Sequence, residues 1–173
     1  MLSLAILGFL AEESMHAYEL RRRISDLMGH SRPISDGALH PALTRLRASG
    51  LVERVGQTRG SGPPRQVMSL TDAGRTELLR RLAEPEETEI TNGSSFFTLL
   101  AFLGRLPEGD QARVLRRRLD FLEAPASFFY RDGEPQRAED VEDRYRRGML
   151  LLARASSRAE RAWLRETIAE LES

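Results

Sequence analysis

The sequence predicts a mainly α-helical protein with one small β-hairpin in its N-terminal half. Apolar residues recur at helical spacing through most of the 173 residues. The exception is a pair of short alternating segments, 51–57 and 65–70, separated by TRGSGPP, a loop that cannot continue either strand. An amphipathic helix from Ser35 to Ser49 runs directly into this hairpin, so the order of elements is helix, strand, loop, strand.

The first two predicted helices differ in how much of their surface is apolar. Residues 2–11 are apolar almost all round, so this helix must be covered on several sides. Ser14 can cap a second helix that continues to about Met28, where Gly29 ends it. The inward stripe of the second helix consists of Ala17, Leu20, Ile24, Leu27 and Met28.

The third predicted helix has a core face and an outward face. Ser35 is its expected N-cap, and Ser49-Gly50 ends it. The core face comprises Leu39, Ala42, Leu43 and Leu46. At 100° per residue, the residues that project outward or sideways are Gly37, His40, Pro41, Thr44 and Arg45. Because Pro41 frees the carbonyl of Gly37, the first turn is expected to be tight or bent.

The chain is predicted to consist of two modules joined by a linker. Thr71 and Asp72 start a fourth helix, which Pro85 closes. Residues 86–95 are polar and rich in Glu, Thr, Asn, Gly and Ser, which is the composition of a linker. The expected organisation is therefore a first domain over residues 1–85, a linker over 86–95, and a second domain over 96–173.

The second module is predicted to be entirely helical. Residues 96–106 are nearly all apolar, PEGD makes a turn, and 110–123 form an arginine-rich helix. A further helical stripe is marked by Val141, Tyr145, Gly148 and Leu152. The spacing of Ser157 and Glu160 fits a capping box that opens a last helix, whose inward residues are Leu164, Ile168 and Leu171.

Charge is distributed unevenly along a chain whose net charge is zero. Nine arginines face four acids between residues 16 and 70, whereas fourteen arginines face seventeen acids from residue 86 onward. The basic excess therefore lies on the N-terminal segment that contains the second helix, the third helix and the hairpin. The chain has no cysteine, which excludes disulfides, and its apolar N-terminal run is short and lacks a basic leader. A cytoplasmic protein without a membrane partner is expected.

Two helices followed by a basic hairpin are what a winged helix-turn-helix needs to enter a DNA groove. Arg45 can fork onto a guanine edge or a phosphate, and Thr44 can contact a base. Ser35 lies at the positive end of the helix, where a phosphate binds well, and Gly37 permits close backbone approach. Double-stranded DNA is therefore the expected partner.

The hairpin loop carries Arg59 and Arg65 on either side of a flexible tip and a stiff Pro-Pro exit. These arginines can follow a minor groove, or they can belong to a solvated turn. An alternative function is a winged helix that contacts only proteins. Arginines on both the helix and the loop favour DNA.

An enzyme is not supported by the residues. His16, His30 and His40 lack the spacing of metal ligands. Ser35, Asp36 and His40 cannot meet as a catalytic triad, because their directions on one helix diverge. No metal and no cofactor are expected.

The N-terminal part resembles the PadR family of transcriptional regulators. The stretches that carry the resemblance are ISDGALHPALTRLRASGLVE, GPPRQVMSLTDAGR, HAYELRRRI and LSLAILGFLAEE, which together span about residues 1 to 83. The resemblance implies a winged helix-turn-helix, a helical dimerisation region and repression by a homodimer on an inverted repeat. It also implies a phosphate contact by Tyr18, for which a half-buried core aromatic is the alternative.

Two positions depart from the family pattern. His40 stands where the family usually has Tyr, and Ala17 stands where Gly is common. An imidazole can still donate to a phosphate, and its contact with DNA can vary with pH because histidine titrates near neutrality. The alternative is that His40 is an incidental surface residue.

The resemblance also suggests a dimer interface and an effector site in the helical parts. The expected interface residues are Leu4, Leu7, Leu115, Leu119, Leu122, Leu164 and Ile168. Aromatic residues gather beyond residue 95, where an aromatic-lined cavity could hold a small flat effector such as a phenolic acid. Its candidate residues are Phe96, Phe97, Phe128, Phe129, Tyr130 and Trp163. The alternative is that these aromatics form the core and the dimer interface.

Overall fold

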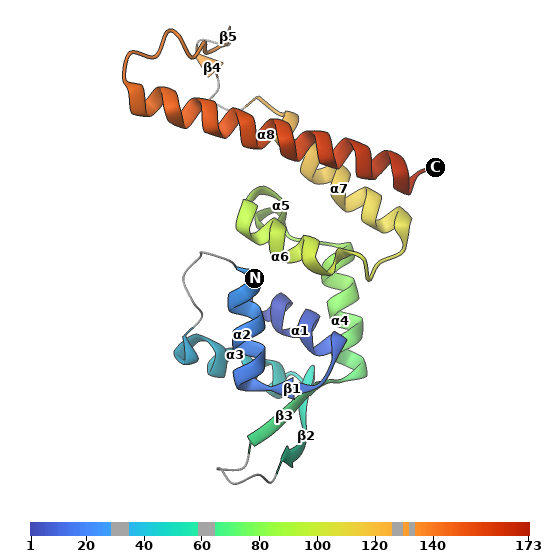
Figure 1. The fold of residues 1–173 in the computed structure, drawn as a ribbon. Coiled ribbons are helices and arrows are strands. Elements are labelled where there is room, and N and C mark those ends of the chain that lie inside the picture. Colours follow the sequence, from blue (N-terminus) through green and yellow to red (C-terminus); the bar gives the residue numbers. More distant parts are fainter. Residues whose placement is uncertain (29–34, 59–64, 126–129, 132–133) are drawn as a thin grey trace. The chain divides into compact units, whose positions relative to one another are not determined.

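The computed structural model describes residues 1–28, 35–58, 65–125, 130–131 and 134–173, which form two compact units (Figure 1). The first unit comprises Met1–Leu106 and the second Pro107–Ser173. Three of the predicted site residues, Arg59, Phe128 and Phe129, lie outside the described residues. The fold is mainly α-helical with a small antiparallel sheet, as the sequence predicted.

The first helix, α1 (Leu2–Glu12), lies at the centre of the N-terminal unit. It packs against α2 (Ala17–Leu27), α3 (Asp36–Ala48), α4 (Asp72–Ala83) and α6 (Gly93–Leu103). The ring of Phe9 meets the ring of Phe102 edge to face, with centroids 5.2 Å apart. Five apolar side chains of α1 are buried, namely Leu4, Ala5, Ile6, Leu7 and Leu10. The prediction that this helix is covered on several sides is confirmed.

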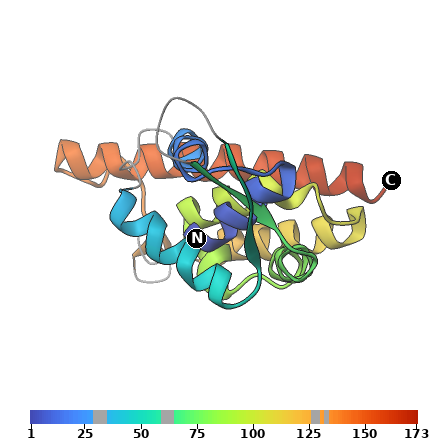
Figure 2. The same ribbon diagram turned by 90° about the horizontal axis from the view of Figure 1, so that it is seen from below.

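The sheet of the N-terminal unit has the order β1-β3-β2. The wing hairpin is formed by β2 (Val52–Thr58) and β3 (Arg65–Leu70), and β1 (Met15–His16) pairs antiparallel with the far side of β3. Figure 2 shows α3 and α4 on opposite sides of the two wing strands. The hairpin therefore lies between the helix with the predicted outward face and the helix that follows it.

The predicted start of the second helix at Ser14 is wrong. Met15 and His16 form β1, and α2 begins at Ala17 with His16 in the N-cap position. The Ser14 hydroxyl instead donates to the Ser69 hydroxyl at 2.8 Å. Pairing with a distant strand, which local propensity does not encode, decides the conformation here.

Two glycines hold α3, the hairpin and α4 in register. Gly50 has a φ of 70° and follows the end of α3, where the Leu51 N–H donates to the Leu46 carbonyl at 2.9 Å. The Leu51 carbonyl accepts from the Thr71 N–H at 3.2 Å. A Cβ added at Gly74 would lie 2.1 Å from this carbonyl oxygen, so α4 reaches its position only because residue 74 has no side chain.

The segment expected to be a linker is folded in the structure. Residues 87–91 form α5 (Glu87–Thr91), whose capping box joins Glu86 and Glu89, and α6 follows at once. The buried Glu89 carboxylate accepts from Arg81 of α4 at 2.7 Å, and Ile90 is buried. The division between compact units falls after Leu106. The polar composition of this segment did not predict α5, because its acidic residues cap the helix and pair with Arg81.

The C-terminal unit is built on two antiparallel helices, α7 (Glu108–Glu123) and α8 (Arg144–Leu171), with short strands β4 (Tyr130–Arg131) and β5 (Glu134–Pro135) between them. Arg118 of α7 is 4% exposed and donates to Glu160 of α8 at 2.7 Å and 3.2 Å. Two further ion pairs join the helices, Arg116 with Glu172 and Arg165 with Glu123.

The predicted start of a last helix at Ser157 is also wrong, because α8 runs unbroken through that residue. Its N-cap is Asp143, whose carboxylate accepts from the Arg146 N–H at 2.8 Å. Glu160 pairs with Arg118 of α7. The capping-box spacing therefore comes from a residue that forms an interhelical ion pair and no cap. No helix among the described residues is long and apolar enough to cross a membrane.

Candidate nucleic-acid interface

The two faces of α3 match the sequence prediction. The core-face residues Leu39, Ala42, Leu43 and Leu46 are buried. Gly37, His40, Pro41, Thr44 and Arg45 are exposed. The Ser35 carbonyl accepts from the N–H groups of both Ala38 and Leu39, at 3.0 and 3.1 Å, so the first turn is tight as expected. Helix α3 therefore offers an outward face from a rigid support.

A groove of about 610 Å³ runs along this outward face. Strand β1 contributes His16, the start of α2 contributes Tyr18, and β3 contributes Gln66 and Met68. Helix α3 contributes a polar and basic set, His40, Thr44 and Arg47. Strand β2 adds Arg54. Of the predicted site, the structure thus brings Tyr18, His40 and Thr44 to one groove.

The other predicted DNA contacts that the structure describes do not line this groove. Ser35 and Gly37 are exposed at the start of α3, and Arg45 is exposed near its end. The Ser35 side chain makes no capping hydrogen bond, although Ser35 occupies the N-cap position. Arg65 begins β3, and its side chain lies outside the described residues.

Sequence reasoning missed four polar residues of the groove: His16, Arg47, Arg54 and Gln66. Arg47 was visible as a basic residue in the last turn of α3, three positions after Thr44. Arg54 follows Val52 in the alternation of β2, where a register shift occurs between Arg54 and Gly56. The position of His16 depends on β1, because its Nδ1 atom lies 3.2 Å from the Gln66 carbonyl oxygen. Only the pairing of β1 with β3 shows that His16 belongs to the groove.

Tyr18 is 64% exposed, so the alternative of a half-buried core aromatic is wrong. The guanidinium of Arg21 lies 5.5 Å from the centre of the Tyr18 ring, close enough for a cation–π contact. This contact orients the phenol at the mouth of the groove and adds a positive charge beside it.

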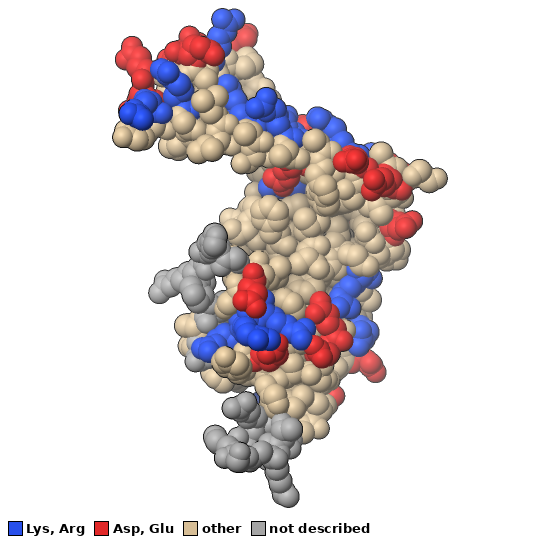
Figure 3. Space-filling model, viewed as in Figure 1, with Lys and Arg blue, Asp and Glu red and all other residues tan. Residues whose placement is uncertain are grey.

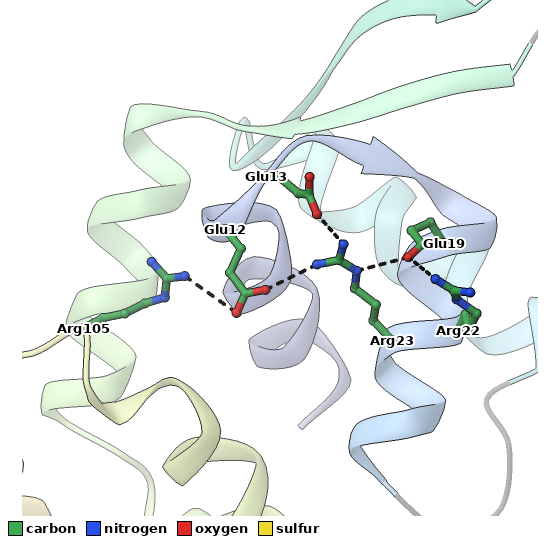
Figure 4. Close-up of polar contacts among 6 residues, drawn as sticks. All are labelled: Glu12, Glu13, Glu19, Arg22, Arg23 and Arg105. Atoms are coloured by element: carbon green, nitrogen blue, oxygen red, sulfur yellow. Dashed lines mark hydrogen bonds and ion pairs between the residues drawn. The ribbon is translucent and has the colours of Figure 1, made fainter.

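Arg22 and Arg23, which follow on α2, are engaged in ion pairs with acids (Figure 4). Arg23 points among three carboxylates, those of Glu12, Glu13 and Glu19. A hydrogen bond from Arg22, and a weaker contribution from Arg23, hold the pKa of Glu19 below its ordinary value. On the face of the N-terminal unit seen in Figure 3, basic and acidic side chains alternate across α2. These arginines anchor α2, so the net charge of the segment overstates the charge available to DNA.

The predicted dimer interface does not coincide with exposed apolar surface. Leu4 and Leu7 are buried in the core of the N-terminal unit, and Leu115, Leu164 and Ile168 are buried as well. Leu119 and Leu122 are half-buried. A side chain already covered by its own chain has little surface left for a second copy. The apolar residues that remain exposed on α8 are others, among them Tyr145, Met149 and Leu152.

The described residues of the predicted aromatic effector site do not line one cavity. Phe96 and Phe97 are adjacent on α6, where Phe96 is 1% exposed and Phe97 is 62% exposed. Trp163 is exposed on α8. Only Tyr130 lines a groove of the C-terminal unit, and its neighbours there are mainly polar and aliphatic. Within the described part of the chain, no group of three or more His, Cys, Asp or Glu residues is arranged to hold a metal ion.

The helices α2 and α3, the exposed outward face of α3 and the antiparallel hairpin beside it define a winged helix-turn-helix. The model of the family described as the transcriptional regulator PadR-like family matches residues 6–80. Over these residues the chain is similar to the PadR-like family, which is a family of transcriptional regulators.

Solved structures of PadR proteins are similar to this chain. A PadR-like transcription factor from Bacteroides fragilis is 28% identical over 45% of this chain and 73% of its own, with a TM-score of 0.40. Bacillus subtilis PadR in complex with operator DNA is 20% identical over 98% of both chains, with a TM-score of 0.47. The same protein with p-coumaric acid is 19% identical over 99% of this chain and 96% of its own, with a TM-score of 0.43. A search of curated proteins found no match.

Proposed function

We propose that this protein is a homodimeric transcriptional repressor that binds an inverted-repeat operator and is released by a small aromatic effector. The observation that carries the proposal is the groove on α3, where one outward face gathers hydrogen-bonding and basic side chains. His40, Thr44 and Arg47 lie on the same side of one helix. The width of a major groove admits such a helix.

The side chains at this groove suit the two kinds of contact that DNA requires. Thr44 can hydrogen bond to a base edge, and Arg45 and Arg47 can fork onto a guanine or a phosphate. Tyr18 and Arg54 line the same groove and can contact the phosphate backbone. Ser35 stands at the helix N-terminus, where the backbone N–H groups favour an anion.

A stripe of α8 supports the homodimer, and we call it the α8 seam. Its large residues, Tyr145, Met149, Leu152 and Trp163, are between 42% and 74% exposed. Small exposed residues, Ser156 and Ala159, fill the positions between Leu152 and Trp163. The spacing alternates between four and three residues, which is the pattern of a coiled-coil seam. A second copy of α8 carries the same pattern, so the α8 seam is complementary to itself.

The length of α8 leaves room for this second copy. At 1.5 Å per residue its 28 residues extend roughly 42 Å, whereas the 16 residues of α7 extend roughly 24 Å. The residues of α8 that are buried, Leu150, Leu164 and Ile168, fall on another face of the helix than the α8 seam. A dimer joined along α8 would carry two recognition helices, as an inverted repeat requires.

Selection of bound sequences from random duplex DNA tests the proposal. We expect an enriched inverted repeat whose half-sites are about one helical turn apart. The affinity should fall about 10³-fold to 10⁵-fold between low and moderate salt, if each complex neutralises roughly six to ten phosphates. Recovery of no common sequence, or a complex that is indifferent to salt, would instead indicate a winged helix that contacts only proteins.

Substitution in the α8 seam tests the dimer separately. Leu152→Glu places a charge in the seam, and we expect a monomer in sedimentation equilibrium with weakened binding to the inverted repeat. Leu151→Glu makes the same change at a neighbouring exposed residue outside the seam and should leave the dimer intact. Equal behaviour of the two variants would show that the seam does not join the subunits.

A further inference from the structure

The base of the wing hairpin meets two helices at Thr71, the N-cap residue of α4. The pair at this base is Val52 with Leu70, so Thr71 directly follows the hairpin. The Thr71 hydroxyl donates to the Gly50 carbonyl at 2.7 Å and accepts from the Gly74 N–H at 3.0 Å. We call this pair of hydrogen bonds the Thr71 bridge. It joins the turn that ends α3 to the first turn of α4.

The Thr71 bridge contains one bond more than a helix cap requires. The bond from the Gly74 N–H is an ordinary N-cap contact, which Ser, Asp and Asn also accept. The bond to Gly50 needs a donor, and an ionised Asp has none. Gly50 is exposed, so water could satisfy its carbonyl if Thr71 did not. The second bond is therefore explained by the elements that it joins and not by a need to satisfy a buried group.

On one side, the Thr71 bridge holds the last turn of α3. The Gly50 N–H donates to the Arg47 carbonyl at 3.0 Å, and the Leu51 N–H donates to the Leu46 carbonyl at 2.9 Å. Gly50 itself has a φ of 70°, in the region that favours glycine. A residue without a side chain restricts the backbone little, so this turn is where α3 and the wing can rotate against each other. A bond that holds the Gly50 carbonyl opposes that rotation.

On the other side, the Thr71 bridge holds the wing strand that carries Arg54. Arg54 lies opposite Met68, two pairs along the ladder from Val52 and Leu70 at the base. The Thr71 N–H also donates to the Leu51 carbonyl at 3.2 Å, which extends the contact between the two strands past that base. The angle of the hairpin at its base therefore decides where the Arg54 side chain lies.

Arg47 and Arg54 line the same groove, but they come from the two elements that the turn at Gly50 connects. Their relative position depends on that turn, which the Thr71 bridge holds. We propose that Thr71 is a positioning residue, whose bond to Gly50 fixes the wing against α3 so that Arg47 and Arg54 contact one DNA duplex together. The inference rests on the proposed function and deepens it, because it names the bond on which joint use of helix and wing depends. Preorganisation of this kind lowers the cost of ordering the two side chains on binding.

Three substitutions of Thr71 separate the bond to Gly50 from the helix cap. Thr71→Ser keeps a hydroxyl and can make both bonds. Thr71→Asp keeps an acceptor for the Gly74 N–H but cannot donate to Gly50. Thr71→Val has the shape of threonine and can make neither bond. Thr71→Asp is the decisive variant, because an acidic N-cap preserves the start of α4.

Two control variants match these changes. Thr76→Val also replaces a threonine by valine, but the Thr76 hydroxyl donates to the Asp72 carbonyl of its own helix at 3.1 Å. Ala73→Asp adds the same charge as Thr71→Asp at an exposed residue in the first turn of α4. Neither control removes the Thr71 bridge, so each isolates an effect that is unrelated to it.

Amide hydrogen exchange of the full chain without DNA tests the hold on the turn. We expect Thr71→Asp and Thr71→Val to raise the exchange rates of the Gly50 and Leu51 N–H groups about tenfold, because the turn opens locally. Thr71→Ser and both controls should stay within about threefold of the parent. The buried helix α1 reports global unfolding. Unchanged exchange at Gly50 and Leu51 in Thr71→Asp, or an equal rise throughout α1, would overturn the proposal.

A double-mutant cycle on the selected operator tests the positioning of Arg54. In the parent, Arg54→Ala is expected to weaken operator binding about fivefold to tenfold. In the Thr71→Asp background, the same substitution should weaken it less than about threefold, because Arg54 is no longer held where it contacts DNA. In the Thr71→Ser and Ala73→Asp backgrounds, the full loss should return. A residue that only stabilised the fold would leave the effect of Arg54→Ala unchanged, and that result would overturn the proposal.

The exchange measurement and the DNA selection fail separately. If Gly50 and Leu51 exchange faster in Thr71→Asp but the parent selects no DNA sequence, the regulatory function falls and the hold of Thr71 on the turn stands. If the parent selects an inverted repeat but Arg54→Ala weakens binding equally in the parent and in Thr71→Asp, the positioning role falls and the regulatory function stands.

Discussion

Two sets of arginines, one in each unit of this chain, play opposite roles. In the C-terminal unit, Arg118 is buried and joins α7 to α8 through Glu160. In the N-terminal unit, Arg47 and Arg54 line the groove on α3, and no carboxylate partner is recorded for either among the described residues. There the backbone fit around Gly74 holds the reading elements together. The same residue type therefore supports structure at Arg118 and faces a groove at Arg47 and Arg54, a difference that a count of charges does not detect.

The largest expected effect is the loss of stability caused by a substitution at Gly74, which tests whether backbone fit holds the N-terminal unit together. Gly74→Ala would place a methyl group 2.1 Å from the Leu51 carbonyl oxygen, which is itself held by Thr71. Because backbone must move, we expect a loss of about 3 kcal/mol in the free energy of unfolding. Urea unfolding measures it, and Gly56→Ala, where a Cβ meets nothing within 4 Å, is the control. Equal stability of the two variants would mean that α4 can move away at little cost.

The stability of the C-terminal unit is expected to depend on the ion pair between Arg118 and Glu160. Arg118→Met should lower the free energy of unfolding by about 2 kcal/mol, because it leaves Glu160 beside apolar surface without its partner. The value is modest because the Glu160 side chain is 22% exposed and can regain water. Urea unfolding of the single variant and of Arg118→Met with Glu160→Leu provides the comparison. The double variant should recover most of the loss, and an additive result would contradict a direct pair.

The groove arginines should behave in the reverse manner. Arg47→Ala is expected to leave the free energy of unfolding within about 0.5 kcal/mol of the parent and to weaken operator binding by about 1 to 3 kcal/mol. Arg75→Ala, an exposed arginine of α4 that does not line the groove, is the charge-matched control. Binding titrations on the selected operator measure both. A loss shared equally by the two variants would show that only total charge matters.

The smallest effect concerns the ion pairs that anchor α2. The pKa of Glu19 lies below its ordinary value of 4.5, chiefly because Arg22 donates a hydrogen bond to it. The ionised form is therefore favoured in the folded state, and its contribution is present above pH 4.5 and is lost as the pH falls through the lower folded pKa. Glu19→Gln should flatten the loss of stability below pH 4.5 relative to the parent protein, and an unchanged slope would contradict this role of the ion pairs. Chemical unfolding between pH 3 and pH 7 measures this slope.

Most of the fold and part of the candidate site followed from local sequence. The spacing of Leu39 and Leu43 predicted which side of α3 faces outward, and the loop between the strands predicted the hairpin. Arg47 and His16 were missed because the groove is formed by elements that are distant in sequence. The turn at Glu89 was missed because its acids form a cap and an ion pair, and their composition is that of a linker.

The sequence by itself determined the helices, the hairpin and the outward face of α3, because these depend on periodicity within one element. Only the tertiary structure decided which apolar residues are exposed. Leu4 and Leu164 have the pattern of interface residues but are covered by their own chain, whereas Tyr145 and Leu152 lie open. Tertiary contacts likewise decided which arginines are engaged, because a guanidinium finds its partner through space and a sequence records only its neighbours along the chain.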